Sequence, residues 1–239
     1  MFSLFKKKPT IHFYTVADGL EEVMPPVKAS KFMPDWWKKI PKNLKFNEID
    51  YKGTVRNCPA LPDLWQEGYV IRLWCDLYIN VEEDGNYNWR TPDERFTFEH
   101  HDHEQYNKWL PDHAKVKLVL KPDCPWRIKT DPGYSVMQLP LTYDFNPIFE
   151  TLPGVVWTDT HHQINQQLIF KKAGRHLIQR GTPLAVYIPF KRTKYNVKIT
   201  NFNEESKKLE NIFNTRIRGK FRGAYRERQR EMKKCPFHK

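Results

Sequence analysis

The densest cluster of side chains that could do chemistry is the run Glu99-His100-His101-Asp102-His103-Glu104. Within it, His100 and Asp102 have the His-x-Asp spacing that supplies two of the three ligands in the facial triad of non-haem iron oxygenases. The third ligand would come from a later histidine, namely His161, His162 or His176. One hypothesis is therefore an iron site formed by His100, Asp102 and His162.

The same hypothesis gives a role to two later cations. Either Lys172 or Arg175 could hold the carboxylate of a 2-oxoglutarate-type co-substrate. The competing interpretation is a polar loop near the mouth of a barrel, because a His-x-Asp pair arises easily in a chain with nine histidines. We favour the polar loop, so the main prediction is a protein without a cofactor and the alternative is a protein that binds iron.

Two further clusters could bind a ligand. Trp36 and Trp37 could form an aromatic platform, although side chains of this size more often cover a core. His161 and His162 follow Asp159 after a turn, where loops commonly present polar groups to solvent. The chain has no serine nucleophile elbow and no glycine-rich phosphate loop. Hydrolysis through serine and a phosphate cradle at a helix N-terminus therefore have no support.

The strongest charge feature is the C-terminal segment, residues 206–239. It contains twelve Lys or Arg against three Glu, a net charge of +9 out of +12 for the whole chain. Apolar residues recur there at every fourth position, which predicts an amphipathic helix beginning near Asn203. The helix could dock through its apolar stripe, and its basic face could bind nucleic acid or an acidic protein surface. The residues assigned to this contact are Arg218, Lys220, Phe221, Arg222, Tyr225 and Arg226.

Short apolar runs bounded by turn residues predict strands over most of the chain before Tyr195. The central runs are residues 134–141, 163–170 and 183–190. The other expected strands are residues 9–17, one long strand at 69–79, its hairpin partner at 87–90, 96–98, and 115–120 with a continuation at 126–129 after a break at 122–125. We expect roughly nine to twelve strands in a single jelly-roll or β-clip barrel. Pro/Trp-rich N-terminal packing should include a short helix that starts near Asp35 and ends before Pro41.

Composition bounds the class of protein. Hydrophobic residues make up 39% of the 239 residues and include eight Trp, which is enough for a packed core. The four cysteines lie far apart and fit a reducing compartment better than a disulfide framework. No apolar run reaches the roughly 20 residues needed to cross a bilayer. We expect a soluble cytoplasmic protein with a β-rich domain at 1–195, a basic helical extension at 196–239 and no membrane partner. An oligomer is compatible with these features.

The central stretch resembles the dUTPase and dCTP-deaminase superfamily. The run Gly154–Thr160 is similar to that family's Gly-Val-Ile-Asp turn, Gly181–Phe190 to its last strand, and Pro132–Val136 to the strand before its Arg-Ser-Ser motif. In this chain, however, Leu141–Phe145 stands where the family has Arg-Ser-Ser, and Trp157 where it has Asp. The resemblance therefore implies the fold of that family and not its catalytic activity.

The whole chain also resembles a group of proteins from tailed bacteriophages of marine bacteria. The phrases that carry this resemblance are Met-Pro-Pro, Pro-Asp-Trp-Trp, Cys-Pro-Ala, Gly-Tyr-Val-Ile and Gly-Thr-Pro-Leu. It implies a phage-encoded protein, located in the host cytoplasm or in the virion. Three functions remain open: a non-catalytic binding or assembly protein, which we favour, an iron- and 2-oxoglutarate-type oxygenase, and a nucleotide-handling enzyme of dUTPase-like fold.

Overall fold

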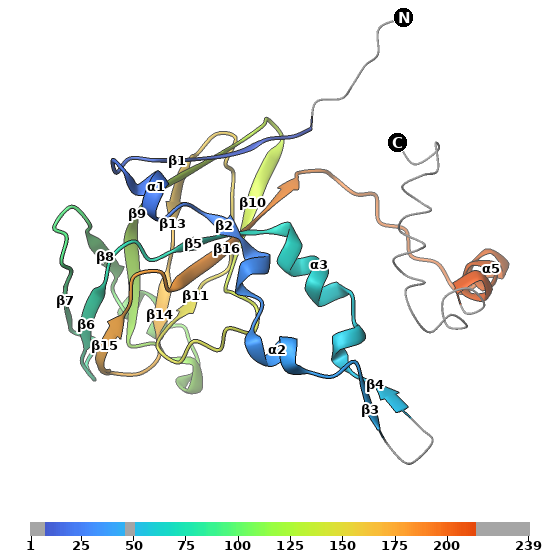
Figure 1. Cartoon of the computed structure of the whole chain (residues 1–239), viewed down its shortest axis with the longest axis horizontal. Helices are drawn as coiled ribbons and strands as arrows, with labels where there is room; N and C mark the ends of the chain where they lie inside the picture. Colours follow the sequence, from blue (N-terminus) through green and yellow to red (C-terminus); the bar gives the residue numbers. More distant parts are fainter. Residues whose placement is uncertain (1–7, 46–50, 214–239) are drawn as a thin grey trace, which may run out of the picture. The chain divides into compact units, whose positions relative to one another are not determined.

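The computed structural model describes residues 8–45 and 51–213, and it divides the chain into two compact units, residues 1–193 and 194–239 (Figure 1). The first unit is mainly β. No helix in the described part of the chain is long and apolar enough to span a membrane.

All strand pairs in the first unit are antiparallel, and they form four sheets. The six-stranded sheet contains β1 (Ile11–Thr15), β8 (Phe98–His101), β9 (Leu118–Thr130), β11 (Glu150–Thr151), β13 (Gln163–Asn165) and β14 (Leu168–Phe170). The five-stranded sheet has the order β12 (Gly154–Val156), β10 (Tyr134–Leu139), β16 (Pro183–Lys191), β5 (Tyr69–Arg72) and β2 (Val27–Lys28). A three-stranded sheet has the order β15 (Gly174–Ile178), β6 (Leu77–Val81) and β7 (Tyr87–Arg90). A two-stranded sheet pairs β3 (Asn43–Lys45) with β4 (Tyr51–Gly53).

The longest strand, β9, runs through two prolines at which the sequence predicted a break. Its thirteen residues pair with β8 and β14 over its first half and with β1 and β13 over its second. Pro122 and Pro125 lie where β9 changes partners. A proline costs a strand only the hydrogen bond of its missing N–H. The predicted break is wrong because few ladder hydrogen bonds are required at that point.

The long strand expected at residues 69–79 is instead two strands in different sheets. The strand β5 pairs with β16 and β2, whereas β6 pairs with β15 and β7. Between them the chain crosses from one sheet to the other. There the N–H of Leu73 donates to the carbonyl of Thr182 (2.8 Å), and the N–H of Gly181 donates to the carbonyl of Leu73 (2.7 Å). The expected hairpin between β6 and β7 is confirmed.

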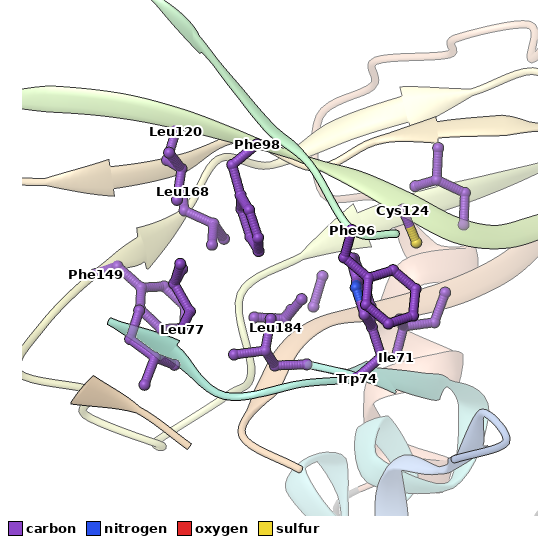
Figure 2. Close-up of a cluster of buried hydrophobic side chains, with 14 of the residues drawn as sticks. Ile71, Trp74, Leu77, Phe96, Phe98, Leu120, Cys124, Phe149, Leu168 and Leu184 are labelled. Atoms are coloured by element: carbon purple, nitrogen blue, oxygen red, sulfur yellow. The ribbon is translucent and has the colours of Figure 1, made fainter. Parts of the chain in front are cut away.

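The main hydrophobic core lies between the three larger sheets, and a second, smaller cluster contains Ala29, Val70 and Val186. Buried side chains from β5, β6, β8, β9, β14 and β16 meet in the main core (Figure 2), including Ile71, Leu77, Phe98, Leu120, Leu168 and Leu184. The single closed barrel expected from the sequence is not found among the described strands. The run at residues 69–79 contributes β5 and β6 to two different sheets, whereas the run at 163–170 forms two short strands, β13 and β14, that both pair with β9.

Short helices supply the N-terminal packing. The helix α2 (Asp35–Lys39) begins after Pro34 and ends at Lys39, before Pro41, as predicted. Trp37 is 1% exposed and packs on Trp65 with ring centroids 5.4 Å apart. The other helices of the first unit are α1 (Leu20–Val23), α3 (Ala60–Glu67), α4 (Glu104–Asn107) and 3-10 turns at Ala29–Phe32, Val55–Asn57 and Asp112–Ala114.

The second unit contains α5 (Glu204–Phe213). Its first turn is capped by the Asn203 side chain, whose Oδ1 accepts the backbone N–H of Ser206 (2.9 Å). The predicted start of the helix near Asn203 is therefore confirmed. The basic continuation, with Arg218, Lys220, Phe221, Arg222, Tyr225 and Arg226, lies outside the described residues.

Replacing Gly68 by Ala should destabilise the first unit. A Cβ at Gly68 would lie 2.4 Å from Cγ2 of Val186, a buried and rotationally stiff side chain. We expect Gly68→Ala to lower the free energy of unfolding by about 1–3 kcal/mol. The control is Gly154→Ala, because a Cβ there meets nothing within 4 Å. Chemical denaturation of both variants checks this, and equal stabilities would contradict it.

Candidate functional site

The three residues of the hypothetical iron site do not come together. His100 lies opposite Leu120 on β9, whereas the carbonyl of His162 accepts the N–H of Ile128 (2.9 Å) further along the same strand. Eight residues of strand at about 3.3 Å each separate these two points by roughly 26 Å. His162 therefore cannot complete a site with His100 and Asp102.

Each of these side chains has a local role instead. His100 Nδ1 lies 2.8 Å from the hydroxyl of Tyr87, and His162 Nδ1 lies 2.9 Å from the hydroxyl of Tyr14. The carboxylate of Asp102 accepts the N–H of Glu104 (2.9 Å), which starts α4. Within residues 8–45 and 51–213, no group of three or more His, Cys, Asp or Glu side chains is arranged to hold a metal ion.

The two tryptophans predicted as a platform are divided between core and surface. Trp37 is buried, whereas Trp36 is 42% exposed and contacts two aromatic rings of the loop after β10. These rings are Tyr143 and Phe145, with centroids 5.7 and 6.0 Å from that of Trp36. Both have positive φ, an uncommon conformation for a non-glycine residue. The sequence pattern did not indicate Tyr143 and Phe145, because only tertiary packing brings them to Trp36.

His161 lines a cleft of about 380 Å³ between β12 and β13. These strands follow one another in the chain but pair in different sheets, so they diverge and leave a gap. The cleft is rich in carboxamides, namely Gln138, Gln163, Asn165 and Gln167, and Trp157 stands at its rim, 58% exposed. Carboxamides both donate and accept hydrogen bonds. The cleft can therefore hold a neutral polar ligand.

Asp159, expected at a solvated corner, forms a partly buried ion pair. Its side chain is 7% exposed, binds the guanidinium of Arg192 and accepts the N–H of Gly133 (2.9 Å). These donors lower the pKa of Asp159 to about 2. Arg192 also covers the Trp157 ring at 4.2 Å. Arg192 carried no sequence signal, because its partner lies 33 positions away.

The two cations assigned to a co-substrate lie on one edge of the three-stranded sheet. Lys172 is exposed in the turn before β15, and Arg175 is exposed on β15 itself. Arg175 lines a groove of about 580 Å³ over the outer face of β15, β6 and β7. Neither residue lies next to His100 in the sheet register, since β8 pairs with β9 and β15 pairs with β6.

Two cysteine thiols have strongly shifted pKa values, and burial explains both shifts. Burial raises the pKa of the Cys124 thiol to about 12 and that of the Cys75 thiol to about 11. A reactive cysteine instead has a lowered pKa, because the thiolate is the nucleophile. These two thiols are therefore poor nucleophiles near neutral pH.

Comparison with protein-family models and with curated proteins finds no match for this chain.

The Asp159–Arg192 pair should make stability depend on acid pH. The pKa of Asp159 is about 2 in the folded protein, against about 3.9 in an unfolded chain. Its contribution is therefore complete above pH 4 and is lost as the pH falls through 2. We expect the thermal midpoint of the wild type to fall more steeply between about pH 4 and pH 2 than that of Asp159→Asn.

The matched control is Asp112→Asn. Asp112 pairs with Lys115 at 2.8 Å, but its side chain is 96% exposed, so water screens the pair. The Asp112→Asn curve should run parallel to that of the wild type. An Asp159→Asn curve that also runs parallel would show that the ion pair contributes nothing to the acid response.

Proposed function

We propose that this chain is a non-catalytic binding or assembly protein, encoded by a bacteriophage, that attaches to an acidic partner through its C-terminal segment. The observation that carries the proposal is the charge of residues 206–239, which hold +9 of the net +12. Cations concentrated in this way bind polyanions by releasing condensed counterions. The protein would act in the host cytoplasm or in the virion.

The chemistry of the first unit supports binding over catalysis. Catalytic acids, bases and nucleophiles are usually tuned toward the working pH. In this chain burial moves the pKa of Cys75 and Cys124 upward, and the ion pair moves that of Asp159 downward, so all three move away from neutrality. The oxygenase hypothesis gains no support, since His162 lies far from His100 and Asp102.

Nucleic acid is the favoured acidic partner. Phe221 and Tyr225 are interleaved with arginines and lysines in the basic segment. Aromatic rings among cations suit nucleic acid, because bases stack on the rings while the cations contact phosphates. An acidic protein surface would use the cations alone.

Neutralising part of the basic segment should weaken binding of a labelled 30-base-pair DNA duplex. In the full chain we would change Arg218, Lys220, Arg222 and Arg226 to Gln. Each lost phosphate contact makes the slope of log K against log salt shallower by about 0.9. The expected change is therefore up to about 3.6 for four contacts, measured by fluorescence anisotropy at several salt concentrations.

The control removes the same number of charges elsewhere. Four exposed lysines of the N-terminal region would be changed to Gln, namely Lys31, Lys39, Lys42 and Lys45. This variant should retain the salt slope of the wild type. Equal effects of the two variants would mean that net charge, and not the C-terminal segment, determines binding.

A second candidate is a nucleotide-handling enzyme of dUTPase-like fold. It is favoured by the cleft beside Gly154–Trp157, because this is the stretch that resembles the turn of that family. Carboxamides such as Gln163 and Asn165 could hydrogen-bond the edge of a pyrimidine base. The resemblance also implies a trimer, which light scattering would detect.

Under this second hypothesis, adding dUMP should change the tryptophan fluorescence through Trp157 at the rim of the cleft. The response should disappear in Trp157→Phe and persist in Trp109→Phe, because Trp109 is 77% exposed and does not line the cleft. The same response in both variants, or none in the wild type, would remove the support for a nucleotide site.

A further inference from the structure

The outer face of the three-stranded sheet β15–β6–β7 carries an unusual set of side chains. In β6, Leu77, Ile79 and Val81 point into the core, so Tyr78 and Asn80 point outward. The register places Leu177, Tyr78 and Arg90 in one row across the sheet and Arg175, Asn80 and Asn88 in the next. We call these six residues the β6 face. They line the groove of about 580 Å³ together with inward-facing neighbours.

The positive charge of the β6 face forms no ion pair within the described part of the chain. Arg90 lies over the Tyr78 ring, 4.9 Å from its centroid. Among residues 8–45 and 51–213, neither Arg90 nor Arg175 forms a side-chain hydrogen bond or an ion pair, and no carboxylate lines the groove. Five other arginines of the first unit donate from the side chain to a carbonyl or carboxylate, whereas Arg180, among the described residues, donates only its backbone N–H, to Asp76. The five are Arg56, Arg72, Arg95, Arg127 and Arg192. Two exposed guanidiniums are therefore free for an external anion.

The acidic groups nearest in the sheet lie beyond the two ends of β6. Asp76 precedes the strand, and its carboxylate accepts the backbone N–H of Arg180 (2.6 Å). Glu82 follows the strand in the turn to β7, where its N–H donates to the carbonyl of Asn86 (2.8 Å). A carboxylate at each end limits the positively charged surface to the middle of the sheet.

The spacing of these groups fits a polynucleotide. Neighbouring strands lie about 4.8 Å apart and residues rise about 3.3 Å along each strand, so the Cα atoms of Arg90 and Arg175 are roughly 12 Å apart. An extended single strand can place two phosphates of nearby nucleotides at that separation. Tyr78 and Asn80 lie between the arginines, on the central strand.

We propose that the β6 face binds single-stranded nucleic acid. Arg90 and Arg175 contact phosphates, Tyr78 stacks with a base, and Asn80 and Asn88 hydrogen-bond the edges of bases. A single strand is favoured over a duplex because its bases are free to stack on a ring displayed by an open sheet. The choice of a polyanion rests on the proposed function, but the residues are separate from the C-terminal segment.

The test measures binding of fluorescein-labelled dT20 to the full chain by anisotropy. The variant Arg90→Gln/Arg175→Gln should make the salt slope shallower by about 1.4, since a single strand loses about 0.7 per contact. Tyr78→Leu should weaken binding about 5- to 150-fold, and Tyr78→Phe should retain most of the affinity because stacking is preserved. The control Lys39→Gln/Lys42→Gln removes equal charge outside the face and should behave as wild type. An unchanged thermal midpoint would verify that each variant is folded.

Three outcomes would overturn the proposal. The first is that the β6-face variants bind dT20 as the wild type does while the Gln variant of the C-terminal segment loses affinity, which would leave the proposed function intact. The second is that unlabelled duplex DNA competes as well as unlabelled dT20. The third is that polyglutamate displaces dT20 from the wild type but not from Arg90→Gln/Arg175→Gln, which would identify the β6 face as a surface for acidic protein.

A fourth result would separate the two proposals. Loss of affinity in the β6-face variants with an unaffected C-terminal variant would support nucleic-acid binding at the β6 face and contradict the proposed role of the C-terminal segment.

Discussion

The fold depends on the hydrogen bonding of a single long strand, β9. Both of its edges are paired along most of its length, with β8 and β14 near its start and with β1 and β13 near its end. Buried backbone polar groups must be paired, so a strand in this position constrains every segment that meets it. The prolines at 122 and 125 are compatible with the strand because they lie where one set of partners gives way to the next.

A second constraint is the ion pair of Asp159 and Arg192, which connects ends of strands in the five-stranded sheet. Arg192 follows β16, the last strand of this unit, and it binds Asp159, which follows β12. Asp159 in turn accepts the N–H of Gly133 in the turn before β10. One carboxylate therefore connects the ends of three strands of the five-stranded sheet. The same arginine covers Trp157 at the rim of the carboxamide cleft, so the ion pair also fixes one wall of that cleft.

Local sequence patterns predicted strands better than they predicted sheets. The hairpin of β6 and β7, the strands β10 and β16 and the short helix after Pro34 were predicted correctly, because alternation and turn residues act over a few positions. The broken run at 69–79 and the continuous strand through Pro122 and Pro125 were not predicted, since pairing with distant strands decides both.

The candidate sites show the same difference between local patterns, which the sequence reveals, and long-range contacts, which it does not. The spacing of His100 and Asp102 is a local pattern, but only the fold shows that His162 lies at the other half of β9. The sequence indicated only one continuous strand at 69–79, so the outward positions of β6 were not predicted, and the alignment of Arg90 and Arg175 across it depends on the register.

The crossing between β5 and β6 has a consequence for how the small sheet can change over evolution. The chain passes from β5 to β6 through Leu73 and from β15 to β16 through Thr182, and these two residues are hydrogen-bonded to each other. The β5–β6 connection and the β15–β16 connection are therefore held together at one end of the three-stranded sheet. Tyr78 and Arg175 are exposed, whereas Ile79 is buried in the core. Substitutions at the outward positions can therefore change the surface of this sheet without any change to the packing below it or to the register of β9.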